Sequence, residues 1–208
     1  MRRLLRVALV LAALGALLLA AREGLRWYAR GPWVQREADR LAALAEIRPG
    51  MTVAEIGAGQ GRLAVLVARR LGPAGRLYAT ELGAENLAAL RRAASAGGVE
   101  MVVLEAGEHS ANLAADCCDV VFMRRVYHHL SDPEPIVRGL YAALRPGGRL
   151  AVIDMLSPRL AFWGRHGIAA ETVVPRVVSA GFQLENRVNW WSPIDYCLVF
   201  RKPAQRGL

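Results

Sequence analysis

Cysteine is scarce in this chain, and the spacing of the three cysteines excludes two common kinds of stabilising site. Cys117 and Cys118 are adjacent, Cys197 lies far along the chain, and no C-x-x-C pair occurs. Without such spacing the sequence predicts neither a disulfide framework nor a zinc site. We expect the three side chains to be small buried apolar groups.

Lysine is almost absent as well. Lys202 is the single lysine among 27 basic residues, and the others are all arginine. This preference, in a chain rich in alanine and leucine, is typical of a GC-rich genome, so it does not indicate nucleic-acid binding. We therefore expect no nucleic-acid partner. The net charge of +9 is compatible with anionic lipid surfaces or acidic substrates.

The excess of apolar residues is concentrated at the N-terminus. Residues 4–21 are apolar apart from Arg6, and the arginines and aromatics of residues 22–30 suit a membrane interface. The uninterrupted run is shorter than the roughly 20 residues of a full span, and no good signal-peptidase site follows it. We predict an uncleaved membrane anchor over residues 1–30 and a separate domain over residues 31–208. A cleaved signal peptide and a peripheral or buried helix are the alternatives.

The rest of the chain alternates between strand and helix patterns. Predicted strands cover residues 51–56, 76–80, 100–104, 118–123, 149–155, 182–190 and 195–201. Predicted helices cover residues 33–47, 60–71, 84–96, 133–144 and 171–180, and Pro175 suits the last only within its first turn. This alternation predicts an α/β fold with a doubly wound, mostly parallel seven-stranded sheet, closed by an antiparallel hairpin. A ligand would bind at the carboxyl ends of the strands.

The first predicted strand leads into a loop with glycine at every second position. Residues 55–62 read E-I-G-A-G-Q-G-R. Glycines at this density allow a sharp backbone turn that lies directly against a ligand. A loop between a strand and a helix presents N–H groups and a positive helix end to a nucleotide-like molecule. The spacing is G-x-G-x-G, whereas the dinucleotide fingerprint is G-x-G-x-x-G, which disfavours a nicotinamide cofactor.

Two later segments accompany the glycine loop. Residues 119–133 read D-V-V-F-M-R-R-V-Y-H-H-L-S-D-P, and residues 144–154 read L-R-P-G-G-R-L-A-V-I-D. The three segments, in this order and spacing over about residues 50–155, resemble the motifs of the class I S-adenosylmethionine (SAM)-dependent methyltransferases. The resemblance implies a Rossmann-like methyltransferase fold, here with an N-terminal hydrophobic helix, and SAM as the cofactor.

The resemblance also implies roles for particular residues. The predicted cofactor-binding residues are Glu55, Gly57, Gly59, Gly61, Glu81, Glu108 and Arg124. Glu55 would order the amino-acid end of SAM and Glu81 the ribose, although NAD enzymes use a carboxylate in the same way. Glu108 would contact the adenine, with Glu105 as its competitor.

The loop after the fourth strand faces the methyl group in this superfamily. The candidates for substrate contact are therefore Arg124, Arg125, Tyr127, His128 and His129. The last three are the candidate catalytic residues, and a histidine there can act as a general base. Each histidine has a structural alternative, in which it caps or packs the loop. We expect no metal, because adjacent histidines point apart and no carboxylate cluster accompanies them.

The sequence thus predicts a SAM-dependent methyltransferase acting on a small, possibly lipophilic acceptor at the membrane surface. Its catalytic domain would face the cytoplasm, because SAM is a cytosolic cofactor. Aromatic residues in the segment 156–171, together with Trp190 and Trp191, are candidates for a lid, and packing is their alternative role. The N-P-P-[YF] tetrapeptide is absent, which disfavours adenine or glutamine as the acceptor. A nicotinamide-dependent oxidoreductase and a non-catalytic, membrane-tethered nucleotide-binding module are the alternative functions.

Overall fold

A computed structural model describes residues 32–155, 167–192 and 194–204, together with Gly15 and Leu19. The chain divides into the units Met1–Glu37 and Ala38–Leu208, and helix α2 (Pro32–Leu44) begins in the first and ends in the second. The predicted anchor over residues 1–30 lies outside the described residues, apart from Gly15 and Leu19. Within the described part of the chain, no helix combines the length and apolarity needed to cross a bilayer.

The second unit is built on a sheet of seven strands in the order β3-β2-β1-β4-β5-β7-β6. The strands are β1 (Thr52–Ile56), β2 (Arg76–Glu81), β3 (Val102–Glu105), β4 (Cys118–Arg124), β5 (Leu144–Met155), β6 (Gln183–Asn189) and β7 (Asp195–Arg201). Strands β1 to β5 pair in parallel, whereas β7 is antiparallel to both β5 and β6. The predicted mostly parallel sheet with a terminal antiparallel hairpin is confirmed.

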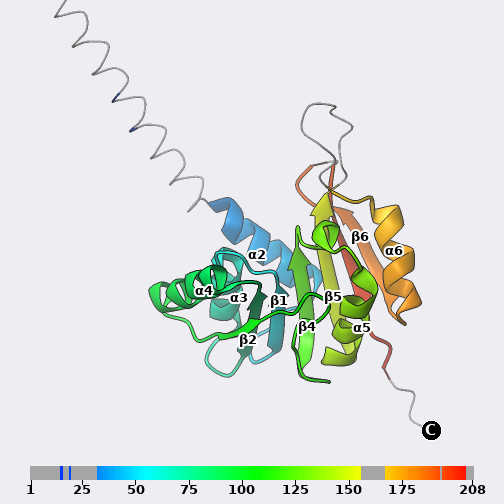
Figure 1. Ribbon diagram of the computed structural model, residues 1–208, viewed down its shortest axis with the longest axis horizontal. Coiled ribbons are helices and arrows are strands. Elements are labelled where there is room, and N and C mark those ends of the chain that lie inside the picture. Colours follow the sequence, from blue (N-terminus) through cyan, green and yellow to red (C-terminus); the bar gives the residue numbers. More distant parts are fainter. Residues whose placement is uncertain (1–14, 16–18, 20–31, 156–166, 193, 205–208) are drawn as a thin grey trace, which may run out of the picture. The chain divides into compact units, whose positions relative to one another are not determined.

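Helices cover both faces of this sheet (Figure 1). The remaining helices are α3 (Arg62–Leu71), α4 (Ala84–Gly97), the short 3₁₀ helix η1 (Tyr127–His129), α5 (Pro133–Ala143) and α6 (Ala170–Ser179). Successive side chains of a strand point to opposite faces, so each central strand supplies two cores. In β4, Val120 and Phe122 pack with α3, whereas Val121 and Met123 pack with α5 and α6.

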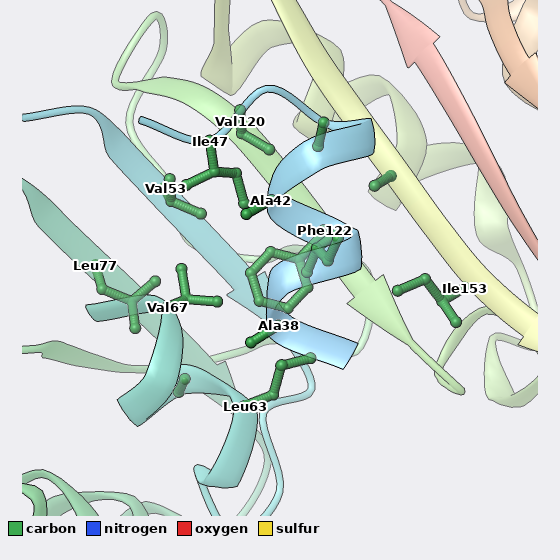
Figure 2. Close-up of a cluster of buried hydrophobic side chains, with 14 of the residues drawn as sticks. Ala38, Ala42, Ile47, Val53, Leu63, Val67, Leu77, Val120, Phe122 and Ile153 are labelled. Carbon is green, nitrogen blue, oxygen red and sulfur yellow. The ribbon is translucent and has the colours of Figure 1, made fainter. Parts of the chain in front are cut away.

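The first of these cores lies beneath the part of α2 that belongs to the second unit. Figure 2 shows Phe122 reaching from the sheet towards the helix that carries Ala38 and Ala42. Phe122 has no exposed surface and both alanines are buried. The small side chains on the helix leave room for the large ring below, so the helix can lie close to the sheet.

The predicted start of the fifth strand at residue 149 was wrong. Strand β5 begins at Leu144 and has an irregular register opposite Cys118 and Val120. A Cβ on Gly148 would lie 2.9 Å from the carbonyl oxygen of Asp119, so glycine allows the two strands to approach closely there. Pro175 lies inside α6 and beyond its first turn; burial of Val173 and Val177 on the same helix offsets the lost backbone hydrogen bond.

Candidate functional site

The strand order reverses between β1 and β4, which creates a crevice at the carboxyl ends of these strands. A cavity of about 470 Å³ lies at this position. Loops that follow β1, β2, β3 and β4 form its wall. The residues of the wall include Gly57, Glu81, Glu108, Arg124, Arg125 and His129.

The glycine loop turns between β1 and α3 in a conformation that few other residues adopt. The φ angles of Gly57, Gly59 and Gly61 are 67°, 55° and 73°, in the left-handed region that favours glycine. A Cβ on Gly57 would lie 2.5 Å from Cγ2 of Val126, so glycine also lets this loop approach the loop after β4. Because α3 begins at Arg62, the positive end of its dipole lies beside the loop.

Glu81, the last residue of β2, holds the glycine loop through its carboxylate. Its Oε2 accepts a hydrogen bond from the Gly59 N–H at 2.6 Å, and its Oε1 accepts one from the Leu82 N–H at 2.9 Å. Each carboxylate oxygen can accept a second hydrogen bond. The arrangement therefore leaves capacity for the two hydroxyls of a ribose at the cavity wall.

Replacing Glu81 with glutamine is expected to weaken SAM binding by about ten- to a hundredfold. The substitution removes the charge that strengthens the bond to the loop and the expected bond to the ribose, and hydrogen bonds to charged groups contribute about 1.5–3 kcal/mol. Isothermal titration calorimetry with SAM measures the change. Glu85→Gln, on the first turn of α4 and outside the cavity wall, is the matched control and should bind SAM as the wild type does.

The structure places only one of the two acids predicted to contact the adenine, Glu105 and Glu108, on the cavity wall. Glu108 lies on the cavity wall, whereas Glu105 is exposed at the end of β3 and is not part of the wall. The backbone carbonyl of Glu105 instead accepts a hydrogen bond from the side-chain amide of Asn112 at 2.8 Å. Of the two acids, Glu108 is therefore the one placed to contact a bound nucleoside.

The three candidate catalytic residues form η1, but only His129 lies on the cavity wall. Tyr127 is 1% exposed and packs in the core beneath α5 and α6. Burial raises the pKa of the Tyr127 hydroxyl, and the guanidinium of Arg176 partly opposes this rise. The tyrosine is thus placed to support the loop from below, and His129 is placed to touch a ligand.

His128 is held by Asp154, a residue that sequence reasoning missed as part of the site. The His128 Nδ1 lies 2.7 Å from Asp154 Oδ1, and the His128 backbone N–H donates to Oδ2 at 3.2 Å. Asp154 Oδ1 also accepts the Met155 N–H at 2.8 Å, and its side chain has no exposed surface. The imidazole of His128 in turn lies against that of His129, with ring centroids 4.0 Å apart and the ring planes tilted by 42°. Asp154 thereby orients the pair of histidines.

The remaining predicted cofactor residues lie on the first strand and its loop. Glu55 is 3% exposed near the end of β1. Gly59 and Gly61 belong to the loop that Gly57 begins, but they are not part of the cavity wall. Arg124 ends β4 on the wall itself. Among the residues that the structure describes, no group of three or more histidine, cysteine, aspartate or glutamate side chains is placed to hold a metal ion.

The expected aromatic lid is only partly described, because residues 156–166 lie outside the described residues. Trp190 is buried in the first core, whereas Trp191 is 47% exposed. The guanidinium of Arg40 lies 5.1 and 5.2 Å from the centroids of these two rings, within the range of cation–π attraction. It also donates a hydrogen bond of 2.7 Å to the Asn189 carbonyl. Trp190 therefore has a packing role, and Trp191 is the one available to a ligand or surface.

The sheet order, with its antiparallel final pair, and the glycine loop at the switch point define the Rossmann-like fold of the class I SAM-dependent methyltransferases. Residues 54–152 match the family model described as a methyltransferase domain. A methyltransferase-domain model thus matches this segment, and the resemblance seen in the sequence is confirmed. SAM is the cofactor that the superfamily implies, and the glycine loop, Glu81 and Glu108 fit it.

Individual relatives agree with this assignment. The arsenite methyltransferase of Halobacterium salinarum is 30% identical over 115 residues, which are 55% of this chain and 29% of that protein. The ubiquinone/menaquinone biosynthesis C-methyltransferase of Klebsiella pneumoniae is 28% identical over 116 residues, 54% of this chain and 45% of that protein. The chain thus spans less than half the length of these two curated relatives. A SAM-dependent methyltransferase from Aquifex aeolicus has the same fold, with a TM-score of 0.73, 20% identity and coverage of 79% of this chain and 89% of that chain.

Proposed function

We propose that this protein transfers a methyl group from SAM to an oxygen, nitrogen or carbon atom of a small acceptor. The observation that carries the proposal is the cavity at the switch point, whose wall combines Gly57 and Glu81 on one side with His129 on the other. SAM supplies a methyl group on a sulfonium, which is already activated for attack. The protein therefore contributes mainly by bringing the acceptor atom in line with that group.

His129 is the residue proposed to receive a proton from a hydroxyl acceptor. It lies on the cavity wall, and its ring is held against that of His128, which Asp154 anchors from the buried side. A histidine held in one orientation can accept a proton without losing further side-chain freedom. In this proposal Asp154 and His128 position the base, and Tyr127 packs beneath them.

The acceptor is proposed to be lipophilic. Leu82, Leu130 and Ile136 contribute apolar surface to the cavity wall, and the Klebsiella relative is named for ubiquinone and menaquinone synthesis. The Halobacterium relative is named for arsenite, a soft acceptor that thiolates would hold best. No cysteine of the described part of the chain lies on the cavity wall, so an arsenite acceptor is disfavoured.

The membrane location is proposed from the sequence of residues 1–30, with the catalytic domain facing the cytoplasmic supply of SAM. Exposed Trp191 and Ile194, near the carboxyl end of β6, suit contact with a lipid surface. Flotation of the full chain with phospholipid vesicles tests this location, and added vesicles should raise the rate with a lipophilic acceptor. Saturation by a soluble polar acceptor that neither lipid nor removal of residues 1–30 affects would contradict the membrane proposal.

Calorimetry with SAM and S-adenosylhomocysteine on the full chain tests the methyltransferase proposal. We expect both to bind and NAD(H) not to bind. Binding of NAD(H) without SAM would favour a nicotinamide-dependent oxidoreductase instead. Binding of SAM without turnover across a broad panel of acceptors would favour a non-catalytic nucleotide-binding module.

A further inference from the structure

Arg125, the residue that follows β4, holds an unfavourable backbone conformation on the cavity wall. Its φ angle is 55°, in the left-handed region that side chains other than glycine, asparagine and aspartate rarely adopt. Among the described residues other than glycine, three more have a positive φ angle: Glu46, Asn112 and Asp116. Asn112 and Asp116 are residue types that tolerate it, and Glu46 forms two ion pairs with arginines. Arg125 has neither explanation.

The position of Arg125 is enforced by its neighbours. Arg124 pairs with Ile153 between β4 and β5, and the Arg125 N–H donates a hydrogen bond of 2.7 Å to the Ile153 carbonyl. The chain then enters η1 after Val126. A glycine would meet these requirements with less strain, so arginine at this position has a cost in stability. Strain of this kind is typical of functional sites.

The guanidinium of Arg125 has no partner of its own within the described part of the chain. No hydrogen bond or ion pair joins it to a described side chain, although two carboxylates, Glu81 and Glu108, lie on the same cavity wall. Both oxygens of Glu81 already accept backbone N–H groups. A guanidinium is permanently charged and presents paired N–H donors that match a carboxylate, sulfonate or phosphate. The residue is therefore a cation available to an acidic ligand group.

We propose that Arg125 binds an acid group of the acceptor, so that preferred acceptors are amphipathic molecules with an anionic group beside an apolar body. The inference rests on the proposed methyltransferase function and specifies its substrate class. The amino-acid end of SAM also carries a carboxylate. The acceptor is the better source, because Arg125 shares the loop after β4 with His129 and Leu130, whereas the cofactor end is assigned to Glu55 and the glycine loop.

The test uses two fluorescent probes with the same ring system, 8-anilino-1-naphthalenesulfonate and the uncharged N-phenyl-1-naphthylamine. Both are titrated into the full chain with and without S-adenosylhomocysteine. Arg125→Gln and Arg125→Gly should each weaken binding of the sulfonate probe about tenfold, as expected for a charge-assisted bond, and leave the uncharged probe unchanged. Arg92→Gln, which removes an exposed arginine on α4 outside the cavity wall, is the control and should change neither.

Stability measurements distinguish a ligand-binding role from a structural one. Arg125→Gly relieves the backbone strain, so its melting temperature should equal that of the wild type or exceed it by about 2–4 °C. A fall of several degrees, or sulfonate binding that is unchanged in both Arg125 variants or equally weakened in Arg92→Gln, would overturn the proposal. Weaker binding of S-adenosylhomocysteine in the Arg125 variants would assign the residue to the cofactor and also overturn it. Failure of the wild type to bind S-adenosylhomocysteine would instead contradict the methyltransferase function.

Discussion

Substituting valine for Gly59 is expected to weaken SAM binding by about a hundredfold or more. Gly59 has a φ of 55°, which a β-branched residue adopts only at considerable cost. Its N–H donates to Glu81, so a shift of the backbone also moves the carboxylate proposed to hold the ribose. A Cβ on Gly59 would meet no protein atom within 4 Å. The lost affinity would therefore come from a changed loop conformation and from the space that the new side chain takes from the ligand. Calorimetry with SAM and S-adenosylhomocysteine measures it.

Gly98→Val is the matched control for this variant. Gly98 also has a positive φ, of 61°, and open space around its missing Cβ, but it caps the C-terminus of α4 and is not part of the glycine loop that bonds to Glu81. Both variants should lose a similar amount of thermal stability, because the backbone strain is similar. Only Gly59→Val should lose the cofactor. Equal losses of affinity in the two variants would mean that general destabilisation explains the result.

The second large effect is expected from His129→Gln, which should lower kcat/KM about 10²–10⁴-fold with a hydroxyl acceptor. Glutamine keeps a polar group on the cavity wall but cannot take up a proton. Binding of S-adenosylhomocysteine should remain unchanged, since the residue is not assigned to the cofactor. Steady-state kinetics measures the fall in kcat/KM, and calorimetry measures the binding of S-adenosylhomocysteine.

Asp154→Asn separates the base from the residues that position it. Asn at this buried site keeps the shape but removes the negative charge that faces His128 Nδ1, so we expect kcat to fall about tenfold, less than in His129→Gln. If His129→Gln leaves the rate unchanged while Asp154→Asn lowers it, the assignment of the base to His129 is wrong.

Sequence patterns predicted much of this fold because they report local physics. Alternating apolar residues and the breaks at glycine and proline located the strands and helices, and only their ends moved. The predicted start of β5 was wrong because the close approach of Gly148 to Asp119 joins residues that are far apart in the chain. Pro175 lies within α6 because burial of neighbouring valines outweighs the local preference of proline.

The sequence by itself determined the class of cofactor, since the glycine loop, Glu81 after the second strand and the two later motifs are short segments with their own spacing. Tertiary structure decided which side chains share the cavity. It placed Glu108 on the wall and left Glu105 outside it, brought Asp154 against His128, and turned Tyr127 into the core. It also showed that Arg125 is strained and without an ionic partner among the described residues. These facts depend on which strand ends meet at one edge of the sheet and on side-chain burial, and neither is a property of any single segment.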